Sequence, residues 1–399
     1  MNNNIPLLYA IKFSKWFMLV MPIIVPFYNS NGLGMTQVFM LQAIYSISTV
    51  ILEIPSGYFA DAYGRKLSIV LGAVLGFLGN LMYCFSFGFE GFMIAEIIMG
   101  IGVSFISGSD SALLYDTLVA RKEEDRYLRF EGFSISVGNF SEAFAGLAGG
   151  ALALISLRTP FYFQAAIGFI AVPASFFLVE PQSHIKKLKV TWQDIIGVVK
   201  YSLHGHKPLR NNMLFSSFIG ASTLTMAWFV QPYFSAIKLP TAWYGILWTA
   251  LNACVGILAF QAYKLEKRMS VDFSNALISV IVSFGYLFLA WTQSYAGIVI
   301  LFVFYLIRGY ATPVLKDSMN RLTPSEMRAT VLSIRSFIIR GLFSVLGPGL
   351  GYLTDKFSLG TALFVAGVVF LCLSLFSLLL LKIENNSVLS SPDSVVKKN

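Results

Sequence analysis

Long apolar runs alternate with short polar connections over almost the whole chain. A helix that crosses the hydrocarbon core of a bilayer needs about 20 mostly apolar residues. The connections between the apolar runs contain turn-forming residues such as Gly and Pro. The pattern therefore predicts twelve membrane-spanning helices, over residues 5–28, 36–59, 67–88, 91–116, 131–155, 160–180, 213–236, 242–263, 273–293, 295–315, 329–353 and 359–381.

The composition supports this interpretation. Hydrophobic residues make up 56% of the chain and charged residues 12%, and the mean hydropathy is +0.70. A water-exposed surface carries many more charges, so a soluble fold is excluded. The formal net charge is +9, but the cations lie in short groups between apolar runs rather than on one solvated face. Nucleic acid is therefore not an expected partner.

The cations also give the chain an orientation. With the N-terminus in the cytoplasm, the outer connections contain only Arg158, Lys238 and Lys356, and the other connecting cations lie on the inner side. Cytoplasmic loops of membrane proteins are enriched in Lys and Arg. We therefore predict a multi-pass protein of the cytoplasmic (inner) membrane with both termini in the cytoplasm.

Six spans, a basic connection and six further spans indicate two related halves. We predict an N-terminal six-helix bundle at 1–180, a cytoplasmic linker at 181–212, a C-terminal six-helix bundle at 213–382 and a disordered tail at 383–399. Apolar and polar residues alternate at helical spacing over 190–203, which predicts a short helix on the membrane surface. Parallel six-span repeats place a substrate site near the midplane between the halves.

The connection after the second span carries the most specific motif. It reads Gly57-Tyr-Phe-Ala-Asp61-Ala-Tyr-Gly64-Arg65-Lys66 and resembles the signature loop of the major facilitator superfamily, with Ala62 in place of the usual first cation. The resemblance implies an all-α membrane fold of two pseudo-symmetric six-helix bundles, secondary transport by alternating access, and a monomer as a sufficient unit. In that family the loop locks the cytoplasmic side in one conformation.

Two other segments depart from patterns within the family. Proton-coupled members often carry Arg on the fourth span, where this chain has Glu96 four residues before Gly100. Drug/proton antiporters resemble one another in a Gly-Pro-x-x-Gly-Gly run on the fifth span. This chain keeps the paired glycines Gly149 and Gly150 but lacks the proline.

Ionisable groups inside a membrane are costly and are functional candidates by default. In the family that the chain resembles, spans one, four, seven and ten line the cavity, which gives as candidate cavity residues Lys12, Lys15, Glu96, Asp110, Trp228, Gln231 and Arg308. All three histidines lie in the central connection, so a coupling proton requires a carboxylate, with Asp110 and Glu142 as candidates. Candidate gating residues are Glu53, Gly57, Asp61, Gly64, Arg65, Lys66, Asp116, Glu131, Arg335 and Arg340.

Each assignment has a structural alternative. Lys12 could reach the cytoplasmic interface with its long side chain, Asp110 and Glu142 could form permanent ion pairs, and Trp228 could face lipid. These alternatives stay open on sequence grounds.

The leading hypothesis is a secondary transporter of a small organic solute, coupled to protons. Lys12, Lys15 and Arg308 favour an anionic or zwitterionic solute. Export is favoured by analogy with similar bacterial carriers. The alternatives are an uptake symporter or facilitator and, in a different class, a non-transporting receptor on the same scaffold. The sequence has no catalytic constellation and no nucleotide-binding or metal-binding motif, so neither an enzyme nor a cofactor is predicted.

Overall fold

The computed structural model describes residues 3–181, 197–324 and 327–389 of the 399-residue chain. Every regular element within these ranges is helical, and eleven helical segments are long and apolar enough to cross a membrane. The predicted fifth span corresponds to α7 (Tyr127–Ala153), which is long enough but is not among the eleven. In a bilayer a helix satisfies its own backbone hydrogen bonds, which is why apolar runs of this length fold in this way.

The chain separates into two compact units, Met1–Leu188 with Phe234–Ala250, and Lys189–Tyr233 with Leu251–Asn399. We call them unit 1 and unit 2. The sequence placed the boundary in the linker at 181–212, whereas here the end of α10 and the start of α11 also belong to unit 1. Most of the predicted surface helix at 190–203 lies outside the described residues, and its described end includes a π-helical turn at Tyr201–Gly205.

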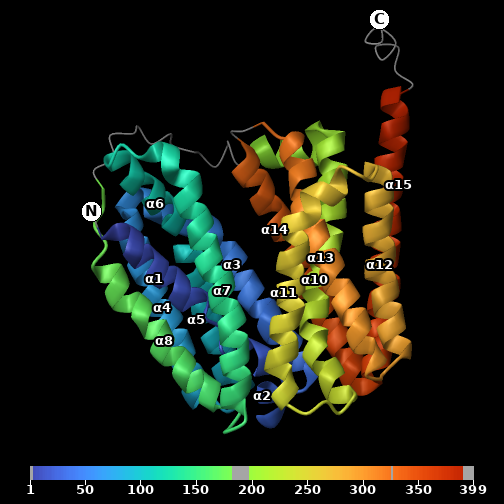
Figure 1. The fold of residues 1–399 in the computed structure, drawn as a ribbon, viewed down its shortest axis with the longest axis horizontal. Coiled ribbons are helices and arrows are strands. Elements are labelled where there is room, and N and C mark those ends of the chain that lie inside the picture. Colours follow the sequence, from blue (N-terminus) through green and yellow to red (C-terminus); the bar gives the residue numbers. More distant parts are fainter. Residues whose placement is uncertain (1–2, 182–196, 325–326, 390–399) are drawn as a thin grey trace, which may run out of the picture. The chain divides into compact units, whose positions relative to one another are not determined.

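Unit 1 has more helices than predicted spans because two spans are interrupted (Figure 1). In it α4 packs against α5 and α8, and α1 against α7 and α8. The helices of this unit are α1 (Asn4–Trp16), α2 (Ile24–Ser30), α3 (Met35–Tyr63), α4 (Arg65–Phe85), α5 (Phe89–Ile106), α6 (Ser109–Ala120), α7 (Tyr127–Ala153) and α8 (Thr159–Phe176).

The first span is interrupted between α1 and a short 3-10 turn at Met21–Ile23. Two neighbouring helices accommodate the non-helical backbone there. The amide of Leu19 donates a hydrogen bond of 2.7 Å to the side-chain oxygen of Gln164 on α8. The carbonyl oxygen of Leu19 occupies the position that a Cβ atom on Gly149 of α7 would need. Gly149, one of the paired glycines of the fifth span, therefore leaves room for the interruption.

The fourth span is interrupted at Gly108, whose φ of +77° favours glycine. α5 ends at Ile106, and α6 begins at Ser109. This joint places Asp110 in the first turn of α6, where the positive end of a helix dipole favours a carboxylate. Neither interruption was predicted from the sequence.

The spans of unit 2 are uninterrupted helices. α12 packs against both α13 and α15, and α14 packs against α15. The final helix continues past Lys382 into the predicted tail and ends at Leu389, and residues 390–399 lie outside the described part. The helices are α10 (Lys207–Ala236), which ends in unit 1, α11 (Ala242–Glu266), which begins there, α12 (Val271–Trp291), α13 (Ala296–Arg321), α14 (Arg328–Lys356) and α15 (Leu359–Leu389).

Candidate functional site

The joint in the fourth span brings together three of the predicted residues. The ammonium of Lys12 on α1 lies 3.4 Å from the carboxylate Oδ2 of Asp110, and each side chain is 17% exposed. The other carboxylate oxygen of Asp110 accepts a 2.9 Å hydrogen bond from the amide of Ser111. The hydroxyl of Ser111 donates to Glu131 on α7 at 2.8 Å. Lys12, Asp110 and Glu131 therefore belong to one network.

A cavity of about 10 Å³ opens beside this network, roughly the space of one water molecule. It is lined by Leu8, Tyr9, Asp110, Ser111, Leu114, Glu131 and Ser134. The lining contains two carboxylates, and among the described residues the Lys12 ammonium forms an ion pair with Asp110 and not with Glu131. A cavity of one-water size that is lined by two carboxylates is suited to passing a proton between them.

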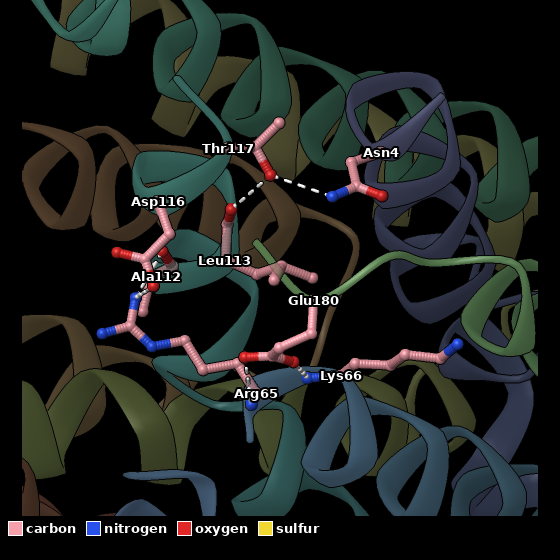
Figure 2. A network of polar contacts seen from close by, with 8 residues as sticks. All are labelled: Asn4, Arg65, Lys66, Ala112, Leu113, Asp116, Thr117 and Glu180. Carbon is pink, nitrogen blue, oxygen red and sulfur yellow. Dashed lines mark hydrogen bonds and ion pairs between the residues drawn. The ribbon is translucent and has the colours of Figure 1, made fainter. Parts of the chain in front are cut away.

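A second network lies at the other end of α6, where the signature loop meets it (Figure 2). The guanidinium of Arg65 is 2.8 Å from Asp116 and donates a further hydrogen bond of 2.5 Å to the carbonyl of Ala112. The side chains of this ion pair are 19% and 9% exposed. Two predicted gating residues thus join the loop to α6.

Glu180, just past α8, supplies the N-terminal cap of α4. Its two carboxylate oxygens accept hydrogen bonds from the amides of Arg65 at 3.0 Å and Lys66 at 2.7 Å (Figure 2). A carboxylate at this position satisfies amides that have no partner within the helix. Gly64 has φ +104°, and a Cβ atom there would lie 3.3 Å from the Glu180 carboxyl carbon. Gly64 is therefore required both by its backbone conformation and by the approach of Glu180.

Asn4 joins the same network to the N-terminus. Its amide donates to the hydroxyl of Thr117 at 3.0 Å and to the carbonyl of Val179 at 2.8 Å, and its oxygen accepts from the Val179 amide at 2.9 Å. Neither Asn4 nor Glu180 was predicted from the sequence to be a functional residue. The only signal was a polar residue at the edge of an apolar run, which many other positions share.

Glu96 lies in a separate cluster among α2, α3, α4 and α5 and is 4% exposed. Its Oε1 atom accepts hydrogen bonds from Tyr83 at 2.5 Å, Gln42 at 2.9 Å and Tyr28 at 3.0 Å. These contacts join four helical elements through one carboxyl group. Glu96 is therefore buried among protein groups, and its role as a cavity residue stays a prediction.

Unit 2 holds the remaining cationic candidates. The guanidinium of Arg308 on α13 lies 5.5 Å from the ring centre of Tyr305. Arg335 on α14 donates a 2.6 Å hydrogen bond from Nε to the hydroxyl of Ser216 on α10. Arg340 is half-buried on the same helix. On α10, Trp228 is half-buried and Gln231 is 2% exposed.

Other predicted residues of unit 1 lie on α1, α3 and α7. Glu142 is about three turns beyond Glu131 on α7, so it is not part of the Asp110 network. Lys15 and Glu53 are half-buried, and Asp61 is exposed at the end of α3. Among the described residues no atom lies within 4 Å of a Cβ placed on Gly57. The gating role of Gly57 stays a prediction.

The helical spans and the charged networks inside them define a polytopic membrane protein of the carrier type. The family model of the Major Facilitator Superfamily matches residues 7–348, and the chain belongs to this family of transporters. This family is one of membrane transporters and not of enzymes.

Curated relatives cover part of the chain. Quinolone resistance protein NorA of Staphylococcus aureus is 26% identical over 196 residues, which are 46% of this chain and 50% of the relative. Multidrug resistance protein 2 of Bacillus subtilis is 27% identical over 169 residues, 42% of this chain and 41% of the relative. The chain thus spans about half the length of the curated relatives it matches.

Solved structures match almost the whole chain. The nucleoside transporter NupG matches with a TM-score of 0.77 and 15% identity, covering 96% of this chain and 99% of that one. A D-xylose–proton symporter matches with a TM-score of 0.72 and 14% identity, covering 94% and 95%. At these identities the likeness establishes the fold alone.

Proposed function

We propose that the protein exports a small organic solute across the cytoplasmic membrane in exchange for protons, with Asp110 as the coupling carboxylate. A monomer with both termini in the cytoplasm is the proposed working unit. The observation that carries the proposal is the contact between the Lys12 ammonium and the Asp110 carboxylate, beside Glu131 and a cavity of one-water size.

The coupling follows from the charge balance at Asp110. As a carboxylate, Asp110 holds Lys12 and thereby joins α1 to α6. When a proton binds to Asp110, the attraction is lost and Lys12 must find another partner or solvent, because an unpaired charge in a membrane is costly. Proton binding therefore changes the relative stability of conformations in which α1 and α6 are together or apart. A carrier that alternates between such conformations couples solute movement to proton movement.

The carboxylate of Glu131 is a second group to which the proton can bind. Ser111 contacts both acids, and Tyr9 lines the cavity between them and donates to the carbonyl of Phe130 at 3.2 Å. The two carboxylates and the one ammonium of this network leave one net negative charge, which a proton can neutralise. Glu142 remains a second candidate for the coupling residue and serves as the comparison in the test.

The proposed direction rests on the relatives. NorA and Multidrug resistance protein 2 are both named as resistance proteins, and removing a toxic solute from the cell is one way to confer resistance. The low identity and partial coverage leave the identity of the solute open.

The test uses purified protein in liposomes that contain a pH-sensitive dye. A panel of anionic, zwitterionic and cationic solutes is added, and the native chain is compared with Asp110→Asn and Glu142→Gln. We expect at least one solute to drive proton movement in the opposite direction, with loss of that movement in Asp110→Asn and its retention in Glu142→Gln. Solute flux without proton movement in the native protein would overturn the coupling, and proton movement in the same direction as the solute would overturn exchange.

A further inference from the structure

Two cations at the predicted inner end of unit 2 have no carboxylate partner among the described residues. Lys316 on α13 is within electrostatic range of Arg335 on α14. None of the ion pairs seen among the described residues involves either of them. The nearby acid Asp317 pairs with Arg321 instead. Two unpaired neighbouring cations repel each other, and an anion between them would remove that repulsion.

The packing of the helices next to the two cations places Lys316 and Arg335 at the same level along the helix axes. Met213 of α10, Met319 of α13 and Val331 of α14 belong to one buried apolar cluster with Leu209. Ser216 and Arg335 lie about one turn after Met213 and Val331, and Lys316 lies about one turn before Met319. Because α13 runs in the opposite direction to α10 and α14, all three residues lie on the same side of the cluster. Ser216, Lys316 and Arg335 therefore form one polar layer next to the buried apolar cluster.

The guanidinium of Arg335 is held in a fixed position with part of its donor capacity unused. Its Nε atom donates to Ser216 Oγ at 2.6 Å. A Cβ on Gly220, one turn further along α10, would lie 3.4 Å from Nη2, so the guanidinium packs over this glycine. No hydrogen bond of either terminal nitrogen to a described residue is seen. Those nitrogens form the planar fork that carboxylates and phosphates bind in a bidentate manner.

Lys316 belongs to a polar stripe on α13. Arg308, Thr312, Lys316 and Asn320 recur every fourth residue and so share one face of the helix. Thr312 and Lys316 are exposed, whereas Val314 and Leu315 between them are buried. In a membrane-spanning helix such a polar face is turned toward the bundle interior or a water-filled cavity, not toward lipid.

We propose that Lys316 and Arg335, with Ser216 as a positioning residue, form a binding site for a carboxylate or phosphate group. The inference rests on the proposed function, because it assigns this site to the anionic group of the transported solute as it enters from the cytoplasm. The same chemistry could be supplied by the phosphate of an anionic lipid headgroup, and the two sources are separated below.

The test measures anion binding without a proton gradient. Purified native protein and the variants Lys316→Gln, Arg335→Gln and Arg335→Lys are titrated in detergent with benzoate, its uncharged amide benzamide, and inorganic phosphate, and thermal stability is followed. Lys264→Gln is the matched control, because Lys264 is exposed at the end of α11 in the same unit. A parallel series compares liposomes of phosphatidylcholine with and without phosphatidylglycerol.

We expect benzoate or phosphate to stabilise the native protein and Lys264→Gln, and benzamide to have no effect. The anion concentration needed for half of the maximal stabilisation should rise at least about tenfold in Lys316→Gln and Arg335→Gln. This factor corresponds to the loss of one hydrogen bond to a charged group. Arg335→Lys should lose less anion affinity than Arg335→Gln, because it keeps the positive charge. Anion binding by Arg335→Lys would exclude a folding defect as the cause of the loss in Arg335→Gln. Stabilisation that comes only from phosphatidylglycerol, and is lost in the same two variants, would support the site with lipid as its source.

Equal anion stabilisation of all the variants would overturn the proposal. An absence of any anion effect on the native protein would also overturn it. Lower transport in Arg335→Gln with unchanged anion binding would assign Arg335 to gating instead. None of these results would affect the role of Asp110, which is tested by proton movement.

Discussion

The two units handle charge inside their helices in different ways. In unit 1 each of the two networks contains an ion pair, Lys12 with Asp110 and Arg65 with Asp116. In unit 2, Lys316 and Arg335 have no carboxylate within ion-pair distance among the described residues. The units also differ in backbone, because the first and fourth spans of unit 1 are interrupted, whereas α13 of unit 2 is a single helix.

This contrast suggests a division of tasks. A paired carboxylate responds to a proton, because neutralising it breaks the pair. An unpaired cation responds to an anionic ligand, because the ligand supplies the missing charge. The interruptions in unit 1 place Asp110 at the start of a helix, where its charge is favoured, and expose backbone groups that Gln164 must satisfy.

The largest expected effect comes from breaking the pair in unit 1. Asp110→Asn leaves the Lys12 ammonium without its carboxylate, at a cost of about 3 kcal/mol for a mostly buried charge in a membrane. We expect a clear fall in the apparent melting temperature in detergent. The double variant Lys12→Gln/Asp110→Asn should recover most of the stability without recovering proton movement. Equal stability of the single and double variants would show that the pair contributes little.

The interruption of the first span gives the next largest effect. Gly149→Ala places a Cβ where the carbonyl oxygen of Leu19 lies, and overpacking of this kind costs about 1–3 kcal/mol. The matched control is Gly76→Ala on α4, where a Cβ meets no atom within 4 Å among the described residues. We expect the yield of monodisperse protein after heating to fall for Gly149→Ala only. Equal behaviour of the two variants would argue against the interrupted geometry.

The cap of α4 provides a smaller effect. Glu180→Ala removes the acceptor for the amides of Arg65 and Lys66, and loss of a helix cap costs about 1 kcal/mol. Glu180→Gln keeps an acceptor oxygen and should lose about half as much stability as Glu180→Ala. The exposed acid Glu124 is a suitable control, and Glu124→Ala should leave the melting temperature unchanged. If the cap contributes nothing to stability, Glu180→Ala, Glu180→Gln and Glu124→Ala would have the same melting temperature.

The smallest effect is expected in unit 2. Ser216→Ala removes the acceptor that holds the Nε atom of Arg335, so the guanidinium loses its orientation but keeps its charge. Anion affinity should fall about threefold to tenfold, because Ser216 orients the guanidinium but does not itself bind the anion. Ser217→Ala is the control, because the buried Ser217 hydroxyl has no hydrogen-bond partner among the described residues. Equal anion affinity in both variants would remove Ser216 from the site.

The sequence allowed the fold to be predicted because apolar length and cation distribution are properties of individual segments. The interruptions at Leu19 and Gly108 escaped prediction, since an apolar window of about 20 residues averages over a few non-helical ones. Lys12 and Asp110 were both named as candidates, but their contact joins residues nearly 100 positions apart and depends on how α1 meets α6. Glu180 was missed because capping depends on the position of the Gly64 turn, which the apolar pattern does not contain.

The central claim is that Asp110 is the carboxylate that couples proton movement to solute movement. The most direct measurement compares two kinds of transport by Asp110→Asn in liposomes, namely solute exchange at equal pH and solute movement driven by a pH gradient. We predict that exchange continues at a rate close to that of the native protein, while the pH gradient no longer drives net movement. The claim would be contradicted if a pH gradient still drove solute movement in Asp110→Asn. It would also be contradicted if a correctly folded Asp110→Asn variant lost both gradient-driven movement and exchange.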